Sequence, residues 1–217
     1  MEDKGPAASN PTPPRAPAPR RAEHRRAMLE AMLETSGELG YRKATVRRVL
    51  ARSGGTAVQF YSQFRSRRDC FAAAYELELD RLCAELLEVG ASKPSWSEGL
   101  AAAVAELFDY ASARPLLARA IFEEVYVAGG AALLRYEEVL ERLSGAIDSA
   151  YRKTSGSCHS PPPVTASFMV GGIAGLVRAK LAAGQAEQLP RALPELMQIA
   201  TALYRDGEAA GGEAKRL

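Results

Sequence analysis

The chain has 217 residues, of which 47% are hydrophobic and 25% are charged, as is typical of a folded protein with a sizeable core. Its net charge of +2 hides a division: residues 1–68 hold 14 Lys/Arg and 6 Asp/Glu, whereas residues 69–217 hold 14 and 20. A basic front indicates contact with a polyanion, and the acidic remainder argues against such contact there. We find no signal-peptide pattern and no apolar run of membrane-spanning length, so we expect a cytoplasmic protein.

Residues 1–20 are rich in proline and alanine and contain no large apolar residue beyond the first methionine. Such a segment cannot bury enough surface to fold, which predicts a disordered arm. The first helix is expected over residues 21–39 and should end at Gly40. Its buried face is expected to comprise Met28, Leu29, Met32 and Leu39.

Residues 41–68 carry the pattern of a helix-turn-helix. Thr45 is a good N-cap for a helix of about two turns, which Gly54 and Gly55 should end. Thr56 caps a second short helix, and two short helices around a glycine turn are typical of this motif. The flanking positive charges that would attract a phosphate backbone are Arg42, Arg47, Arg48, Arg52, Arg65, Arg67 and Arg68.

From residue 69 onward, apolar residues recur every three or four positions, and no strand pattern occurs. Helices are expected from 69 to about 89, from Ser95, from Pro115 to Gly129, over 133–151, near 164–183 and near 190–205. The predicted fold class is all-α with about nine helices. We expect a helix-turn-helix DNA-binding domain at 21–68, a helical effector-binding and dimerisation domain at 69–206, and a disordered tail at 207–217.

Two stretches resemble the tetracycline-repressor (TetR) family of bacterial transcription regulators. The first stretch contains Gly40-Tyr41, Thr45-Val46, Gly54, Phe60-Tyr61, Phe64 and Arg67 in the family's order. The second runs from Met169 to Val177 and on through Leu189 to Leu196, and is similar to the paired helices that form the family's dimer interface. The resemblance implies a homodimeric repressor that binds a near-palindromic operator and is released by a small-molecule effector.

The resemblance also implies which residues contact DNA, with phosphate contacts from Thr45, Tyr61 and Arg67 among them. The expected DNA-binding set is Thr45, Arg47, Arg48, Thr56, Ala57, Gln59, Tyr61, Gln63 and Arg67. Gln59 would pair with an adenine edge and Ala57 would meet a thymine methyl. The sequence departs from the family at Gly55, where valine is usual, at Ser36, where a large aromatic is common, and in a recognition helix without Lys or Arg.

Two further sets concern the carboxy-terminal domain. The expected effector pocket comprises Trp96, Leu107, Phe108, Phe122, Tyr126 and Phe168, although each aromatic is equally consistent with plain core. The expected dimer interface comprises Gly172, Gly175, Leu176, Leu196, Ile199 and Leu203, because small residues allow two helices to approach closely.

No arrangement of residues predicts catalysis, a cofactor or a metal site. The two histidines, His24 and His159, lie near no recognisable nucleophile, and Cys70, Cys83 and Cys158 lack metal-site spacing. We expect reduced thiols and no enzymatic activity. The alternative reading is a helical dimer that binds a ligand or a protein and has only non-specific DNA affinity.

Overall fold

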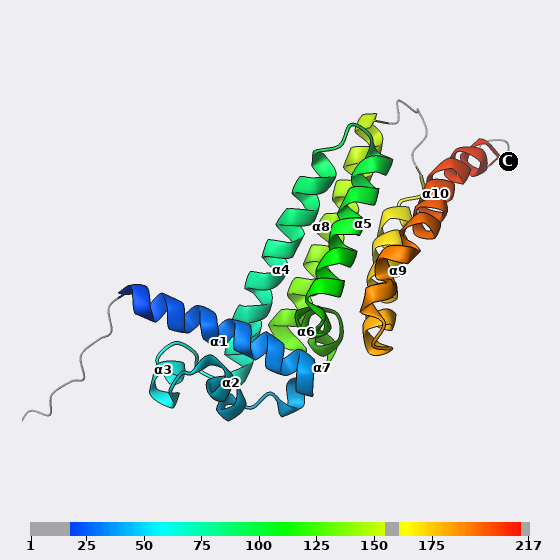
Figure 1. Ribbon diagram of the computed structural model, residues 1–217. Helices are drawn as coiled ribbons and strands as arrows, with labels where there is room; N and C mark the ends of the chain where they lie inside the picture. Colours follow the sequence, from blue (N-terminus) through cyan, green and yellow to red (C-terminus); the bar gives the residue numbers. More distant parts are fainter. Residues whose placement is uncertain (1–17, 155–160, 214–217) are drawn as a thin grey trace, which may run out of the picture.

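The computed structural model describes residues 18–154 and 161–213, and all regular structure in these ranges is helical (Figure 1). The predicted all-α class is therefore confirmed. Most of the predicted amino-terminal arm, the loop with Cys158 and His159, and the last four residues lie outside the described residues.

The amino-terminal domain contains α1 (Ala18–Leu39), η1 (Tyr41–Lys43), α2 (Val46–Ser53) and α3 (Ala57–Tyr61). Met28 and Met32 of α1 are fully buried together with Val49 of α2 and Phe60 of α3, which forms a small shared core. Leu39 was expected on this buried face but is 37% exposed, because α1 ends immediately after it at Gly40 with a φ of 85°.

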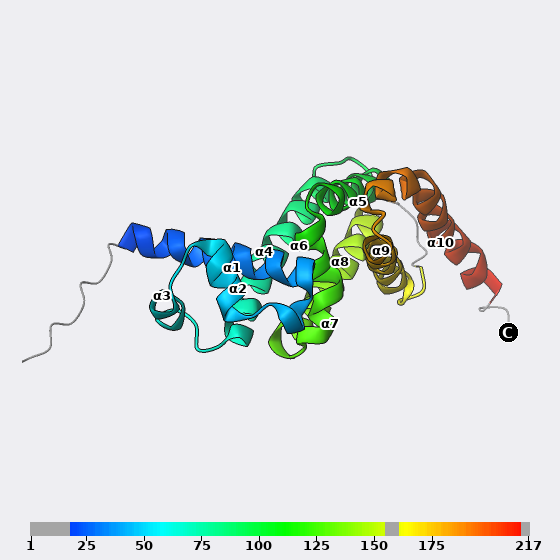
Figure 2. The same ribbon diagram turned by 60° about the horizontal axis from the view of Figure 1, so that its bottom comes forward.

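The long helix α4 (Arg67–Ala91) connects this domain to the carboxy-terminal bundle, which Figure 1 shows rising away from α1–α3. The bundle is built from α5 (Trp96–Ala113), α8 (Gly130–Thr154), α9 (Thr165–Ala182), η3 (Ala186–Ala192) and α10 (Leu193–Glu213). Figure 2 shows α4, α5, α8 and α9 surrounding one interior region, with α10 on the outside of the bundle.

The segment between α5 and α8 is a helix interrupted by one wide turn. It comprises α6 (Pro115–Arg119), the π-helical turn η2 (Ala120–Glu124) and α7 (Val125–Ala128). Counted as one helix, it brings the helices of the described residues to the nine expected. A π-turn contains an extra residue, so the side chains after it are rotated relative to an uninterrupted helix. The regular three-and-four spacing of the sequence did not indicate this turn.

Segment α6 also packs closely on α1 and thus joins the two domains. A Cβ atom at Gly37 of α1 would overlap the backbone carbonyl oxygen of Leu116, so only glycine allows this approach. The sequence analysis gave Gly37 no role.

Two helix boundaries differ from the predicted ones. Helix α1 begins at Ala18, inside the arm predicted for residues 1–20. Helix α10 continues to Glu213 rather than ending near residue 205, so the predicted tail at 207–217 is helical as far as Glu213. Both helices therefore extend further into polar sequence than the apolar periodicity alone indicated.

Candidate functional site

The helix-turn-helix is held in place by short-range capping interactions. Thr45 Oγ1 accepts the backbone N–H of Arg48 at the start of α2, and Gly54 ends α2 in the left-handed conformation with a φ of 67°. Thr56 caps α3: its Oγ1 accepts the N–H of Gln59, whose Oε1 in turn accepts the N–H of Thr56. The predicted caps and turn are confirmed, and α3 is fixed at a defined angle to α2.

The outward face of α3 carries small and apolar side chains. Thr56 and Ala57 are exposed, Val58 is 78% exposed and Tyr61 is 61% exposed. The methyl groups of Ala57 and Val58 and the ring of Tyr61 are therefore available for contact with another molecule. The expected DNA-binding set did not include Val58.

Gln59 does not lie on this outward face. Its Oε1 is engaged in the cap of α3, and its Nε2 lies 3.2 Å from His24 Nδ1 of α1. Gln63 is also half-buried, with its Nε2 donating to the Gln59 carbonyl oxygen at 3.4 Å. The structure thus gives both glutamines, predicted to contact bases, positions within the domain.

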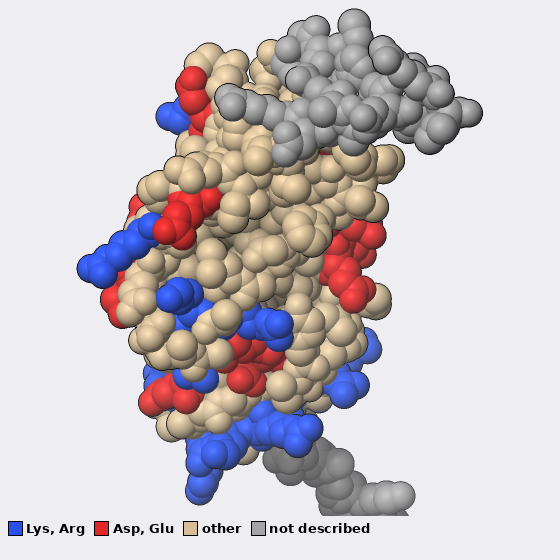
Figure 3. All heavy atoms as spheres, turned by 90° about the vertical axis from the view of Figure 1, so that its right-hand side faces the viewer, with Lys and Arg blue, Asp and Glu red and all other residues tan. Residues whose placement is uncertain are grey.

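Exposed basic residues lie on either side of α2 and α3. In the part of the chain that the structure describes, six of them have no carboxylate partner: Arg42, Lys43, Arg47, Arg48, Arg65 and Arg68. Arg48 is exposed and donates to the Lys43 carbonyl oxygen at 2.7 Å. Figure 3 shows Lys and Arg gathering at the lower end of the molecule, which is the helix-turn-helix end in Figure 1.

Two arginines expected to supply charge to DNA have partners inside the protein. Arg67 donates from Nη1 to the carbonyl oxygens of Tyr41 and Arg42 at 2.7 and 3.1 Å, and its guanidinium lies 4.3 Å from the centre of the Tyr41 ring. Arg52 forms ion pairs with Glu34 and Glu38 of α1. These contacts tie η1 to α4 and α2 to α1, so both side chains position helices.

The departure at Gly55 also has a structural explanation. A Cβ atom at Gly55 would lie 2.6 Å from the terminal methyl carbon of Met28, and 3.3 Å from a methyl carbon of Leu50. Met28 therefore fills the space that a valine side chain would need, and the small core under α3 is closed without it. Ser36 is completely buried and donates its hydroxyl to the Met32 carbonyl oxygen at 2.7 Å.

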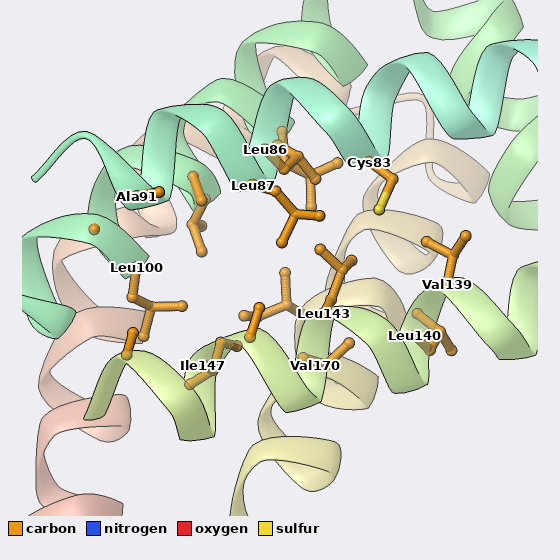
Figure 4. A pocket seen from close by; sticks show the side chains of 18 of the residues that line it. Cys83, Leu86, Leu87, Ala91, Leu100, Val139, Leu140, Leu143, Ile147 and Val170 are labelled. Atoms are coloured by element: carbon orange, nitrogen blue, oxygen red, sulfur yellow. The ribbon is translucent and has the colours of Figure 1, made fainter. Parts of the chain in front are cut away.

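The carboxy-terminal bundle contains a cavity of about 490 Å³ between α4, α5, α8 and α9 (Figure 4). This volume lies in the usual range for small-molecule sites. Its lining is largely aliphatic, and Figure 4 shows side chains from α4 and α8 pointing toward one another across it. The lining includes Leu79, Leu82, Cys83, Leu86, Leu87, Leu100, Ala103, Val104, Val139, Leu140, Leu143, Ile147, Val170 and Ile173.

Half of the predicted pocket residues line this cavity. Trp96, Leu107 and Phe122 do, whereas Phe108, Tyr126 and Phe168 do not. Phe108 is fully buried in packed core beside Leu107. Tyr126 follows the π-turn and is 52% exposed, and Phe168 is 69% exposed because it precedes the lining residue Val170 by two positions, about 200° around a helix.

Two ionisable groups in the lining have pKa values that are raised by their apolar surroundings. Burial raises the pKa of the Tyr136 phenol above its ordinary value, and the nearby Tyr126 adds to the shift. Burial likewise raises the pKa of the Cys83 thiol. Both shifts reflect the apolar lining of the cavity, which favours an apolar occupant.

A short contact joins the cavity to the helix-turn-helix domain. Phe122 of η2 lines the cavity, and two residues later Glu124 Oε2 accepts the backbone N–H of Tyr41 at 2.6 Å. Tyr75 of α4 donates its hydroxyl to the Ile121 carbonyl oxygen at 3.2 Å and so holds the same turn from the other side. Displacement of η2 would therefore act on η1 through the hydrogen bond between Glu124 and Tyr41.

The outer face of α9 is exposed and built from small residues with one large aromatic. Gly171 and Gly172 are exposed, and a Cβ atom on either would meet no other atom within 4 Å. Phe168 lies on the same face, and Ile199 of α10 is 62% exposed. In contrast, Leu176, Leu196 and Leu203 are half-buried against the core of their own chain. Figure 3, which views the side of α9 and α10, shows a broad area without charge.

Within residues 18–154 and 161–213, no helix combines the length and apolar character that a membrane span requires. No group of three or more His, Cys, Asp or Glu in the same ranges is arranged to hold a metal ion.

No family model matches the sequence, and no curated protein does. Solved structures match it over most of its length. The regulator FadR of Bacillus subtilis, in complex with stearoyl-CoA, is 17% identical, with a TM-score of 0.71 over 80% of this chain and 96% of that one. SmeT, the repressor of the Stenotrophomonas maltophilia multidrug efflux pump SmeDEF, is 18% identical, with a TM-score of 0.67 over 83% and 89%. A TetR family regulator from Marinobacter aquaeolei is 21% identical, with a TM-score of 0.66 over 83% and 96%. The chain therefore has the all-helical fold of TetR-family transcriptional regulators.

Proposed function

We propose that this protein is a ligand-responsive transcriptional regulator of the TetR type, a repressor that binds a near-palindromic operator as a homodimer. The observation that carries the proposal is the exposed face of α3 flanked by arginines without carboxylate partners in the described residues. Phosphate contacts from such arginines supply affinity, whereas sequence preference comes from side chains that reach base edges. FadR and SmeT share this fold. FadR is named as a transcriptional regulator and SmeT as a repressor.

The exposed residues of α3 suggest how bases are read. Ala57 and Val58 present methyl groups, which suit the C5-methyl group of thymine in the major groove. Thr56 and Tyr61 offer hydroxyl groups beside them. Gln59 would have to leave the cap of α3 to reach a base, so we assign it to holding the helix.

The cavity is the proposed effector site. Its apolar lining and its size suit an apolar small molecule, and the structure of FadR with stearoyl-CoA supports an elongated ligand in this fold. We propose that an occupant displaces Phe122, moves η2 and shifts η1 through the contact between Glu124 and Tyr41. The effector must bind the DNA-released conformation more tightly than the DNA-bound one, or it would not change operator affinity.

The homodimer is proposed to form through the outer face of α9 together with α10. Gly172 and Gly175 leave room for a partner helix to approach, and Phe168 and Ile199 supply apolar area to bury. A two-fold dimer would present two copies of α3 to successive major grooves, about 34–36 Å apart along the DNA. Phe168 thus moves from the predicted pocket to the proposed interface.

The absence of Lys and Arg from α3 and the engagement of Gln59 favour one alternative, a helical ligand-binding dimer with only non-specific DNA affinity. Selection from a random double-stranded DNA pool at physiological salt separates the two. Enrichment of a near-palindrome with half-sites about one helical turn apart would support the regulator. Weak, salt-sensitive binding without any enriched motif would support the alternative and refute our proposal.

A further inference from the structure

The two ends of the cavity differ in charge. The outer end is formed by the turn between α4 and α5 and by the last turn of α8, which contribute Lys93 and Lys153. The inner end is closed by Phe122 and Tyr136, whose ring centres are 6.3 Å apart. Between them the walls are aliphatic, as Figure 4 shows from Ala91 and Ile147 at one side to Cys83 and Val139 at the other.

At the outer end, a hydrogen bond joins α5 to α8, and two lysines nearby have no ion-pair partner among the described residues. Thr154 Oγ1 accepts the backbone N–H of Trp96 at 3.2 Å and donates to the Ala150 carbonyl oxygen at 2.9 Å, which ties the start of α5 to the end of α8. Lys93, three residues before Trp96, and Lys153, next to Thr154, are both exposed. Neither forms an ion pair with another described residue, and none of the lining residues is acidic.

The length of the cavity follows from the helix that lines it. Lining residues on α4 run from Leu79 to Ala91, a rise of about 18 Å at 1.5 Å per residue. A fully extended chain advances about 1.2 Å per covalent bond, as the reach of about 3.6 Å per three-bond residue implies. An extended aliphatic chain of about fifteen bonds would therefore fill the cavity from end to end.

We infer that the cavity binds an unbranched aliphatic chain that ends in an anionic group, with the anion at Lys93 and Lys153 and the methyl end against Phe122 and Tyr136. Desolvation opposes the reverse orientation, because a charge at the inner end would lose its water and no lining residue there is a lysine or an arginine. This inference names the effector class of the proposed function and rests on that function only for its effect on DNA. Binding of the ligand and its orientation in the cavity can both be measured without DNA.

Trp96 is the only tryptophan of the chain and lines the outer end, where its ring packs 4.5 Å from that of Tyr204. Its fluorescence therefore reports what touches that end. We would titrate the protein with saturated fatty acids that carry one bromine, a contact quencher, either next to the carboxyl group or on the terminal carbon. Strong quenching by the first acid only, with equal affinities by competition, is expected. Quenching by the terminal bromine only would overturn the orientation, and absence of binding would overturn the inference.

The anionic site is tested by changing its two charges. The double variant Lys93→Gln, Lys153→Gln should weaken binding of the fatty acid by between about twofold and thirtyfold, since each exposed ion pair contributes modestly. It should leave the binding of the uncharged alcohol of the same chain length unchanged. Arg152→Gln is the matched control, because Arg152 neighbours Lys153 but does not line the cavity. Equal losses for acid and alcohol, or for the control, would refute the head-group site.

Two sources of such a ligand share this chemistry, a free carboxylate and a phosphate-bearing thioester of the same acid. Competition against the brominated acid ranks them: displacement at lower concentration by either one supports the inference and identifies the source. Displacement by neither would contradict it. These measurements need no DNA, so they distinguish failure of this inference from failure of the proposed regulator, which the DNA selection tests alone.

Discussion

Removal of the Glu124 carboxylate should disconnect the cavity from the helix-turn-helix domain. Glu124 Oε2 accepts the backbone N–H of Tyr41 at 2.6 Å, and Phe122 on the same turn lines the cavity. Tyr41 is itself buried and lies under the guanidinium of Arg67, so its position affects how η1 meets α4. In Glu124→Ala the cavity wall stays in place, but the hydrogen bond to the other domain is lost.

The size of the effect follows from the type of bond. A hydrogen bond to a charged group contributes about 1.5–3 kcal/mol, and the half-buried position of Glu124 argues for the lower end of that range. Since about 1.4 kcal/mol is a factor of ten in an equilibrium constant, the effector-induced loss of operator affinity should shrink by about tenfold. Glu124→Gln keeps an acceptor without the charge and should lose less. Ligand affinity itself should change little in either variant.

The assay is fluorescence anisotropy of a labelled operator duplex, titrated with protein in the absence and presence of saturating ligand. Glu137→Ala is the matched control, because Glu137 is an exposed glutamate on α8 outside the cavity lining. A full effector response in Glu124→Ala would refute the route through η2 and η1. An equal loss in the control would show that the response depends on overall charge and not on this bond.

Three other variants test separate parts of the molecule. Arg47→Ala should weaken binding to every duplex sequence and lower the slope of log affinity against log salt by about one, whereas the remote Arg191→Ala should not; equal slopes would misplace the DNA face. Gly172→Leu should give folded monomers in light scattering, because its side chain meets open space within one chain; an unchanged dimer mass would remove α9 from the interface. Burial raises the pKa of the Cys70 thiol from 9.0 to about 12, so the folded state keeps its proton where the unfolded state loses it. The free energy of unfolding should therefore keep this contribution below pH 9.0 and lose it as the pH rises toward about 12. In Cys70→Ala the urea midpoint should fall less steeply with pH over this range. An equally steep fall in the variant would contradict the raised pKa of this thiol.

Features set by neighbours in the sequence could be predicted. The caps at Thr45 and Thr56 depend on hydrogen bonds to residues three positions ahead, and the left-handed turn at Gly54 depends on that residue alone. The recurrence of apolar residues every three or four positions likewise predicted helices where α4 and α5 lie. These signals are local, so the sequence alone predicted the helix-turn-helix and the nine helices of residues 18–154 and 161–213.

The cavity lining could be predicted only in part, because it depends on whether a buried side chain faces the cavity or the packed core. Leu107 and Phe108 are neighbours in one buried helix, and only the packing of α8 and α9 decides that Leu107 faces the cavity. Phe122 and Tyr126 share a face in a regular helix, but the π-turn between them rotates Tyr126 outward. Large aliphatic residues such as Leu143 and Ile147 have the sequence pattern of core residues, but they form walls of the cavity.

Tertiary contacts also limit the prediction of the DNA-binding residues, and they change which side chains are expected to contact bases. Arg67 and Gln59 have residue types that suit phosphate and base contacts, but each is held by hydrogen bonds to residues distant in sequence, Tyr41 and His24. A side chain that already has buried partners must lose them before it contacts DNA. We therefore expect sequence recognition to depend on the exposed groups of α3, above all the methyl groups of Val58, and affinity to come from the flanking arginines. Val58→Ala should accordingly change the preferred base at one operator position, whereas Gln59→Ala should loosen α3 and weaken binding to all sequences alike.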